Sequence, residues 1–316
     1  MKLYRGLQDF KKLNHAVVTQ GTFDGVHVGH QQILQEVVKE AKVQNAESVL
    51  VTFFPHPRLV LYPDDNSLKL ITGVEEKARL IEACGIDHMI VLPFTKEFSK
   101  LSALEFIRDV LIEGIGMKHF IIGYDHRFGK NREGNIDDVR ELSSIFNYSV
   151  QEIPAQDIND SVISSTKIRN ALLSGQIETA NNYLGHPFTL WGRVVHGRKE
   201  GRKLGYPTAN IKVEDPFKLI PGNGVYVAQA KVYGKVYNGM MSIGNNPTFG
   251  NASWSVEVHL FDFDSDIYEE VVEIRMLKRI RDEVKFEKIE LLKLQLENDE
   301  EISKSYFSDL KNKISV

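Results

Sequence analysis

The sequence predicts two domains of different fold class: an α/β domain built on a parallel sheet, then a small antiparallel β-barrel with a terminal helix. In the first half, short apolar strands alternate with amphipathic helical stretches, which is typical of a parallel sheet wrapped by helices. In the second half, β-branched and aromatic runs follow one another closely between Gly, Asn and Pro turns. The 316 residues are enough for about two domains. Gly185-His186-Pro187 stops the helical pattern and places the boundary between domains 1–185 and 186–316.

The elements of the first domain follow from the spacing of its apolar residues. Strands are predicted over 16–19, 48–54, 89–92, 119–122 and 149–153, and helices over 29–43, 75–83, 102–112, 139–146, 165–173 and 177–183. Ser102 with Glu105 forms a capping-box pattern at the start of one of these helices. Ligands are expected at the carboxyl ends of the strands, where parallel α/β sheets bind them.

The second domain is predicted to contain strands over 189–195, 224–232, 235–241, 254–261 and 270–276. An amphipathic helix is predicted from Phe286 to Leu296 and onwards, and it should pack against the barrel.

Composition excludes several classes of protein. The formal net charge of -4 gives neither the basic footprint of a nucleic-acid-binding protein nor a polybasic membrane patch. Cys84 is the only cysteine, so an intramolecular disulfide and a cysteine-ligated metal cluster are both excluded. No apolar run approaches the ~18 residues of a membrane span, and no signal peptide is evident. We therefore expect a cytoplasmic protein with no obligate protein partner.

The first candidate site is a Gly-rich turn between the first strand and the first helix. Such a turn directs backbone N–H groups and the helix dipole at an anion. His27 and His30 bracket Gly29, where the missing side chain would let a phosphate approach. As neutral donors or as cations, two imidazoles could stabilise charge on an α-phosphate during nucleotidyl transfer. The alternative is a plain strand-to-helix turn with two exposed histidines.

Further along the first domain, Ser164, Ser165 and Thr166 precede Lys167 and Arg169 at a predicted helix start. Hydroxyls at a helix N-terminus followed by basic residues suit a phosphate, although they equally suit an N-cap with solvated charges. The loops 55–57 and 123–129 both follow strands, where ligands gather in this architecture.

The second candidate site is a basic loop in which Gly197, Gly201 and Gly205 are spaced four apart. It could fold over a polyphosphate, but no Gly-Lys-Ser/Thr follows, so it is not a Walker loop. Thr208 and Asn210 lie two apart on an extended segment and therefore point the same way, which suits a Mg²⁺ ion. The alternative is a charged hairpin with a proline turn.

Glu257 lies in an alternating strand, on the same face as His259. A Glu at such a position is usually solvated. If this face lines the mouth of the barrel, the carboxylate could take a proton from a primary alcohol that attacks the γ-phosphate of a nucleotide.

Both halves resemble a known family, the prokaryotic bifunctional riboflavin kinase/FAD synthetases. The first 185 residues or so resemble its adenylyltransferase (Rossmann-like nucleotidyltransferase) half through the segments 21–30, 55–57, 123–129 and 163–169. Residues 186–316 resemble its riboflavin kinase module. The motifs on which this resemblance rests include the glycine-spaced loop, Pro207-Thr208-Ala209-Asn210, Gly224-Val225-Tyr226 and Val256-Glu257-Val258.

The resemblance implies a role for each matching residue. His27, His30 and Glu257 are implied to be catalytic. The implied ATP-binding residues are Gly21, Thr22, Phe23, Asp24, Gly29, Ser164, Ser165, Thr166, Arg169, Gly197, Gly201, Gly205, Thr208 and Asn210. Thr208 and Asn210 are also implied to hold Mg²⁺, and the implied flavin-binding residues are Asp125, Arg127, Phe128, Arg281, Glu283 and Phe286.

The resemblance implies a bifunctional transferase whose substrates are riboflavin, FMN and ATP. The barrel domain would phosphorylate riboflavin to FMN with ATP as co-substrate and Mg²⁺ as cofactor. The α/β domain would then transfer AMP to FMN, giving FAD and pyrophosphate. Two alternatives are a nucleotidyltransferase for another acceptor and a non-catalytic flavin-binding sensor.

Overall fold

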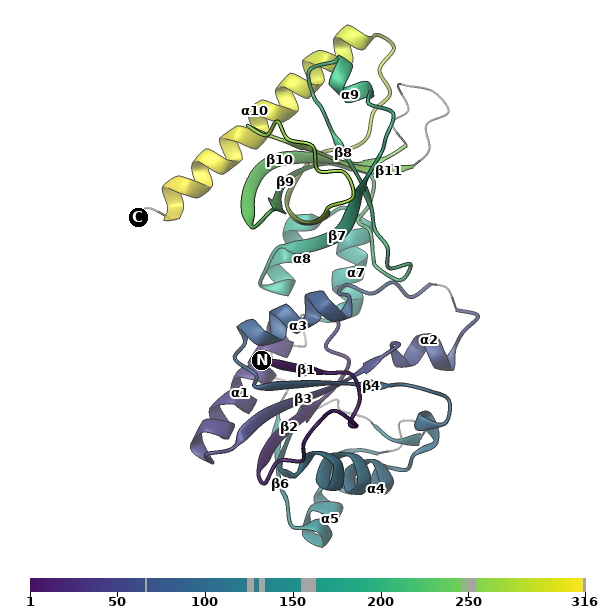
Figure 1. Ribbon diagram of the computed structural model, residues 1–316, viewed down its shortest axis with the longest axis vertical. Helices are drawn as coiled ribbons and strands as arrows, with labels where there is room; N and C mark the ends of the chain where they lie inside the picture. The colour runs from purple at the N-terminus through teal and green to yellow at the C-terminus, as the bar shows by residue number, and fades with distance from the viewer. Residues whose placement is uncertain are drawn as a thin grey trace. The chain divides into compact units, whose positions relative to one another are not determined.

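The computed structural model of the chain describes residues 1–65, 67–123, 128–130, 134–154, 163–245, 248 and 254–314. The chain divides into two compact units, Met1–Ser165 and Thr166–Val316, which are drawn in Figure 1. None of the described helices is long and apolar enough to cross a membrane.

The first unit is built on a parallel sheet, as predicted. Among the described residues the sheet has six strands in the order β1-β4-β3-β2-β5-β6, and every neighbouring pair is parallel. The strands are β1 (Lys2–Tyr4), β2 (Ala16–Gln20), β3 (Glu47–Phe54), β4 (His88–Pro93), β5 (Met117–Gly123) and β6 (Ser149–Ile153). Only β1 was not predicted. It is a three-residue edge strand, too short to carry a periodic signal.

Helices cover both faces of this sheet (Figure 1). They are α1 (Val28–Val43), α2 (Pro57–Leu61), α3 (Val74–Ala83), η1 (Phe98–Lys100), α4 (Ala103–Glu105), η2 (Phe106–Ile115) and α5 (Ile136–Phe146). Successive residues of β2 belong to different apolar clusters. Val17 packs with Leu34 and Val37 of α1, whereas Val18 packs with Ile107 and Leu111 of η2. The sheet is therefore buried on both sides, which explains its continuously apolar strands.

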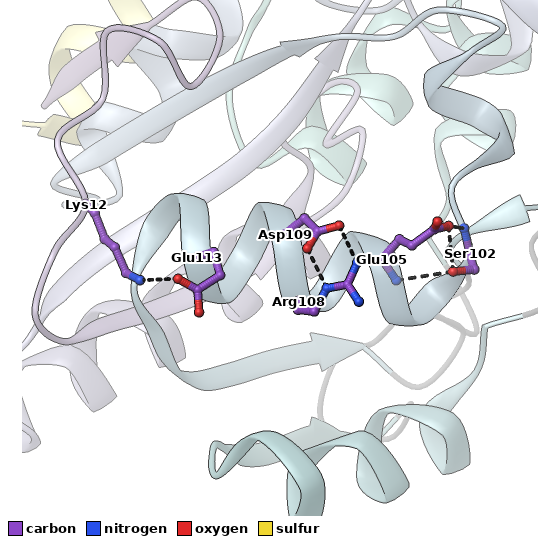
Figure 2. Close-up of polar contacts among 6 residues, drawn as sticks. All are labelled: Lys12, Ser102, Glu105, Arg108, Asp109 and Glu113. Carbon is purple, nitrogen blue, oxygen red and sulfur yellow. Dashed lines mark hydrogen bonds and ion pairs between the residues drawn. The ribbon is translucent and has the colours of Figure 1, made fainter.

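The capping box predicted at Ser102 is confirmed. The Ser102 Oγ accepts a hydrogen bond from the Glu105 N–H at 3.2 Å, and the Glu105 carboxylate accepts one from the Ser102 N–H at 2.8 Å (Figure 2). The helix then continues as η2, wound as a π-helix, to Ile115, three residues beyond the predicted end at Ile112. Arg108 with Asp109, and Lys12 with Glu113, form exposed ion pairs along it, and such pairs contribute little stability (Figure 2).

The second unit contains the predicted antiparallel barrel. Its strands close in the order β10-β11-β8-β7-β12-β9, and neighbouring strands run antiparallel. They are β7 (Phe188–Val195), β8 (Ala209–Lys212), β9 (Gly224–Val232), β10 (Lys235–Gly244), β11 (Ser255–Leu260) and β12 (Val271–Arg281). A short helix, α9 (Glu200–Lys203), lies in the basic loop. The terminal helix α10 (Ile289–Ile314) starts three residues after the predicted Phe286 and packs on β9 and β10 (Figure 1).

Two helices, α7 (Ser165–Leu173) and α8 (Ile177–Leu184), precede the barrel. The Asn181 amide of α8 donates to the Met276 carbonyl at 2.8 Å and accepts from the Phe188 N–H at 2.7 Å. Asn181 thus ties α8 to two barrel strands, and the compact units divide at the first residue of α7 rather than after α8. The predicted boundary between the two catalytic modules, at 185/186, stays a prediction.

Replacement of Asn181 tests this attachment. We expect Asn181→Ala to lower the free energy of unfolding of the second unit by about 1–3 kcal/mol, because it leaves two backbone groups without their partner. Both tryptophans, Trp191 and Trp254, belong to this unit, so denaturant unfolding followed by their fluorescence reports on it. The exposed Asn182→Ala on the same helix is the control. Equal stability of the two variants would contradict the attachment.

Candidate active sites

The first predicted site follows β2, at the point where the order of the parallel sheet reverses. The chain passes from β2 to β3 on one side and later to β5 on the other. Ligands of open α/β sheets bind at such a switch point, beyond the carboxyl ends of the strands. The turn 21–27 occupies this position, and α1 begins directly after it, with His27 as its N-cap.

The backbone of this turn is strained. Phe23 (φ 45°), Gly25 (φ 86°) and Val26 (φ 42°) all adopt left-handed conformations. For Val26, a β-branched residue that is fully buried, this conformation is costly. Strained residues persist only where their surroundings fix them, and they concentrate at functional sites.

Buried polar groups hold the strained turn in place. The Asp24 carboxylate accepts hydrogen bonds from the N–H groups of Ile71 and Thr72, both at 3.0 Å. The Lys77 ammonium of α3 donates to the Thr22 carbonyl at 2.5 Å, and burial lowers the pKa of this lysine. Asp24 thus orders the turn through its side chain. Thr72 and Lys77 were not predicted from the sequence. Lys77 left one signal, because it lies on the same helix face as the apolar Ile81.

His27 and His30 lie against each other as stacked rings, with centroids 3.6 Å apart. His27 is only 3% exposed, so the alternative of two exposed histidines is wrong for this residue. Burial lowers the pKa of His27 to about 4, although the nearby Asp24 opposes the shift. Burial, His27 and Lys77 lower the pKa of His30 as well. Burial therefore favours the neutral form of both rings, which agrees with the neutral-donor alternative.

The hydrogen bonds of the two rings fix the proton on one of them. The His30 backbone N–H donates to the Nδ1 of His27 at 3.3 Å, so the proton of the neutral His27 ring is on Nε2. The Nδ1 of His30 is buried and has no hydrogen-bond partner among the described residues. An unpaired buried nitrogen costs free energy, and such atoms in a native protein call for an explanation such as a functional role.

The remaining predicted residues of the first half lie in three places. Ser165 belongs to the first unit, and its hydroxyl donates to the Asp24 carbonyl at 3.0 Å; Ser164 directly precedes it. Thr166 and Arg169 lie on α7, in the second unit. Asp125 and Arg127 fall outside the described residues. Phe128 is described, and its side chain packs in the apolar core against Phe106.

The second predicted site is a cavity of about 580 Å³ in the barrel unit. All but one of the residues predicted for this half line it: Gly197, Gly201, Thr208, Asn210, Glu257, Arg281, Glu283 and Phe286. Gly205 is the exception. Its left-handed conformation (φ 90°) instead ends the short helix α9 ahead of Tyr206. The cavity thus brings together residues from four separate parts of the sequence.

Glu257 contributes a carboxylate to the lining of this cavity. Its carboxylate accepts a hydrogen bond from the Thr208 hydroxyl at 2.8 Å and another from the Ser255 hydroxyl at 2.9 Å. Asn210 is directly opposite Glu257 in the β8–β11 pairing. The carboxylate is therefore fixed beside the Thr208 and Asn210 pair, as expected if this face lines the barrel. Ser255 was missed, although it shares the strand face of Glu257.

Two positions of the basic loop must be glycine because other parts of the chain approach their Cα atoms closely. A Cβ atom at Gly197 would overlap the side-chain amide of Asn210, and one at Gly201 would overlap the Tyr206 carbonyl. The loop can therefore lie directly on the segment that carries Thr208 and Asn210 only because these positions lack side chains.

The flavin wall, the part of the cavity lining formed by Arg281, Glu283 and Phe286, carries the residues predicted to bind flavin. Phe286 lies under the Arg281 guanidinium, 5.9 Å from the ring centroid, and its N–H donates to the Thr248 hydroxyl at 3.1 Å. The Arg281 guanidinium is also bound by the Asp299 carboxylate of α10, at 2.7 Å at its closest. Asp299 left no signal in the sequence, because its role depends on tertiary contacts.

The two predicted metal ligands of this cavity, Thr208 and Asn210, each offer a side-chain oxygen atom. Among the described residues, no group of three or more His, Cys, Asp or Glu side chains could hold a metal ion alone. The Thr208 hydroxyl gives its proton to Glu257, so its lone pairs remain for a cation. Few protein oxygens, completed by water and phosphate oxygens, are typical of Mg²⁺ sites.

Comparison with known proteins gives a consistent result for both units. The FAD synthetase family model matches residues 9–167, and the riboflavin kinase model matches residues 184–307. The chain is 41% identical to the bifunctional riboflavin kinase/FMN adenylyltransferase of Buchnera aphidicola from Schizaphis graminum, covering 98% of this chain and 99% of the relative. It is 38% identical to the protein of the same name from Listeria monocytogenes, with 94% of each chain covered.

A solved structure shows the same fold over almost the whole chain. It is described as a macrolide-efflux protein from Streptococcus pneumoniae, with 34% identity and a TM-score of 0.85, covering 96% of this chain and 98% of that one. The two family models, the near full-length relatives and the arrangement of the sites agree. The chain belongs to the bifunctional riboflavin kinase/FMN adenylyltransferase family.

Proposed function

We propose that the chain carries out both activities for which its family is named. The barrel unit phosphorylates riboflavin with ATP, and the α/β unit transfers AMP from a second ATP to the FMN formed. The observation that carries the kinase assignment is the Glu257 carboxylate, held by the Thr208 hydroxyl inside a cavity large enough for a substrate. Ligand binding alone would not need a base at this position.

In the kinase step, Glu257 accepts the proton of the primary alcohol of riboflavin. The alcohol oxygen bonds to the γ-phosphorus as the bond from that phosphorus to the bridging oxygen breaks, and ADP leaves. Gly197 and Gly201 let the basic loop lie close to the phosphates, and Arg281, Glu283 and Phe286 contact the flavin. Phosphoryl transfer depends mainly on such positioning and on electrostatic stabilisation.

Thr208 and Asn210 are the residues that would hold Mg²⁺. The ion, when bound, neutralises charge on the transferring phosphates. Two neutral protein oxygens make a weak site on their own, so we expect Mg²⁺ to enter together with ATP.

In the adenylyl step, a phosphate oxygen of FMN bonds to the α-phosphorus of ATP as pyrophosphate leaves. The neutral His27 donates from Nε2–H to the oxygens on which charge develops, and His30 supports it from the stacked position. Backbone N–H groups of the strained turn and the start of α1 supply further donors. Gly21 to Asp24, Gly29, Ser164, Ser165, Thr166 and Arg169 are assigned to ATP, and Asp125, Arg127 and Phe128 to the flavin.

The first prediction removes the base of the kinase step. Glu257→Gln keeps an oxygen that can accept from Thr208 but cannot take up the proton. We expect FMN formation from riboflavin to fall by ~10²–10⁴-fold. Chromatography of the flavin products measures the loss.

The same variant carries its own control, because the other unit is unchanged. FAD formation from supplied FMN should stay at the wild-type rate. If Glu257→Gln stopped both steps equally, or neither, the assignment of the base would be wrong. If the chain were a non-catalytic flavin sensor, even the wild-type protein would form neither FMN nor FAD.

The reciprocal prediction concerns His27. His27→Asn removes the Nε2–H but keeps a residue that caps a helix well, so α1 retains its N-cap. We expect FAD formation from FMN to fall by about 10²-fold or more, because a donor to the transition state is lost.

With riboflavin as substrate, this variant should accumulate FMN, which the same chromatographic assay detects. Unchanged FAD synthesis would remove His27 from the mechanism. If FAD synthesis also proved absent in the wild type while another acceptor was adenylylated, the unit would be a nucleotidyltransferase of different specificity.

A further inference from the structure

The terminal helix α10 forms part of the wall of the kinase cavity. Leu292 and Leu296 line the cavity, and the buried Ser303 and Phe307 continue the same helix face. One carboxylate, that of Asp299, interrupts this apolar stripe, and its side chain is 0% exposed. A buried carboxylate is costly unless it is fully paired, so its partners indicate what it does.

The partners of Asp299 connect α10 to the flavin wall. The Arg281 Nε donates to both carboxylate oxygens at 3.0 Å, and its Nη2 donates to one of them at 2.7 Å. The Gln295 amide adds a further hydrogen bond at 2.8 Å. Asp299 therefore fixes the plane of the guanidinium that lies over Phe286.

The next residue, Glu300, connects the same helix to the nucleotide wall, the part of the cavity lining that carries Thr208 and Asn210. Successive helix positions point about 100° apart, so the two neighbouring carboxylates leave α10 in different directions. The Glu300 carboxylate accepts a hydrogen bond from the Tyr206 hydroxyl at 3.0 Å. Tyr206 is buried and immediately precedes Pro207 and Thr208. Burial, together with Glu300, raises the pKa of Tyr206 to about 12, so the hydroxyl remains a donor at neutral pH.

We propose that Asp299 and Glu300 are positioning residues on one turn of α10. Each carboxylate holds one wall of the kinase cavity, independently of the other. Asp299 orients Arg281 for riboflavin, and Glu300, through Tyr206, sets the position of Thr208 for Mg·ATP. The proposal rests on the proposed kinase function and extends it to two residues, Asp299 and Glu300, that do not themselves touch the substrates. It assigns each carboxylate to one substrate.

The test is a comparison of two conservative variants in the full-length chain. Initial rates of FMN formation are measured with riboflavin varied at saturating Mg·ATP, and then with Mg·ATP varied at saturating riboflavin. Asp299→Asn should raise the KM for riboflavin by about tenfold and change the KM for ATP by less than about twofold. Tyr206→Phe, which removes only the hydroxyl, should raise the KM for ATP and leave that for riboflavin unchanged.

Matched controls come from exposed positions of the same helix. Asp309→Asn makes the same chemical change as Asp299→Asn, and Glu301→Gln neutralises the carboxylate next to Glu300; both positions are exposed, and both variants should leave the two KM values unaltered. FAD formation from FMN, catalysed by the other unit, should be equal in all variants.

A purely structural role would raise both KM values together in either variant, and this result, or no change in either, would overturn the proposal. If Asp299→Asn does not fold, Gln295→Leu removes one contact to the same carboxylate and should show the same selective rise for riboflavin. Absence of FMN formation in the wild type would overturn the proposed kinase function itself, whereas an active wild type without the KM split overturns only this inference.

Discussion

The hydrogen bond from the Thr208 hydroxyl to the Glu257 carboxylate is the contact on which the kinase centre depends. It joins β11 to the residue just before β8, a four-residue strand that closes the barrel between β7 and β11. Without that closure, the base and the Thr208 and Asn210 oxygens would belong to separate edges of a sheet. The barrel topology therefore creates the site by placing residues 49 positions apart within 2.8 Å.

In the α/β unit, too, the fold fixes the polar groups of the candidate site, but it does so within one turn of the chain. There the reacting segment is a single strained turn, and buried groups from other elements, chiefly Asp24 bound to Ile71 and Thr72, and Lys77, hold it. Burial also keeps both histidines neutral. In each unit the polar groups are fixed by the fold before a substrate arrives, which is how enzymes stabilise developing charge without a reorganisation cost. The two proposed centres share this principle and no residues.

The sequence predicted elements with a clear period and motifs with fixed spacing. The parallel strands β2 to β6 and the barrel strands β7 and β9 to β12 were found, whereas β1 and β8, with three and four residues, carry too little pattern. Thr208, Asn210 and Glu257 were found because they lie within short motifs. Asp299 and Lys77 were not, because a buried charge looks like a solvated helix residue until its partner is known. The neutral state of the histidines likewise depends on burial that spacing does not reveal.

The central claim is that the chain holds two phosphate-transfer centres, one for each step, that work independently. The most direct test mixes purified Glu257→Gln protein with purified His27→Asn protein and supplies riboflavin, ATP and Mg²⁺. Alone, each variant should fail to make FAD from riboflavin at a useful rate, because one step is missing. Together they should restore FAD synthesis, because FMN released by the His27 variant is adenylylated by the Glu257 variant. A mixture that accumulates FMN without forming FAD, or forms neither product, would contradict the account.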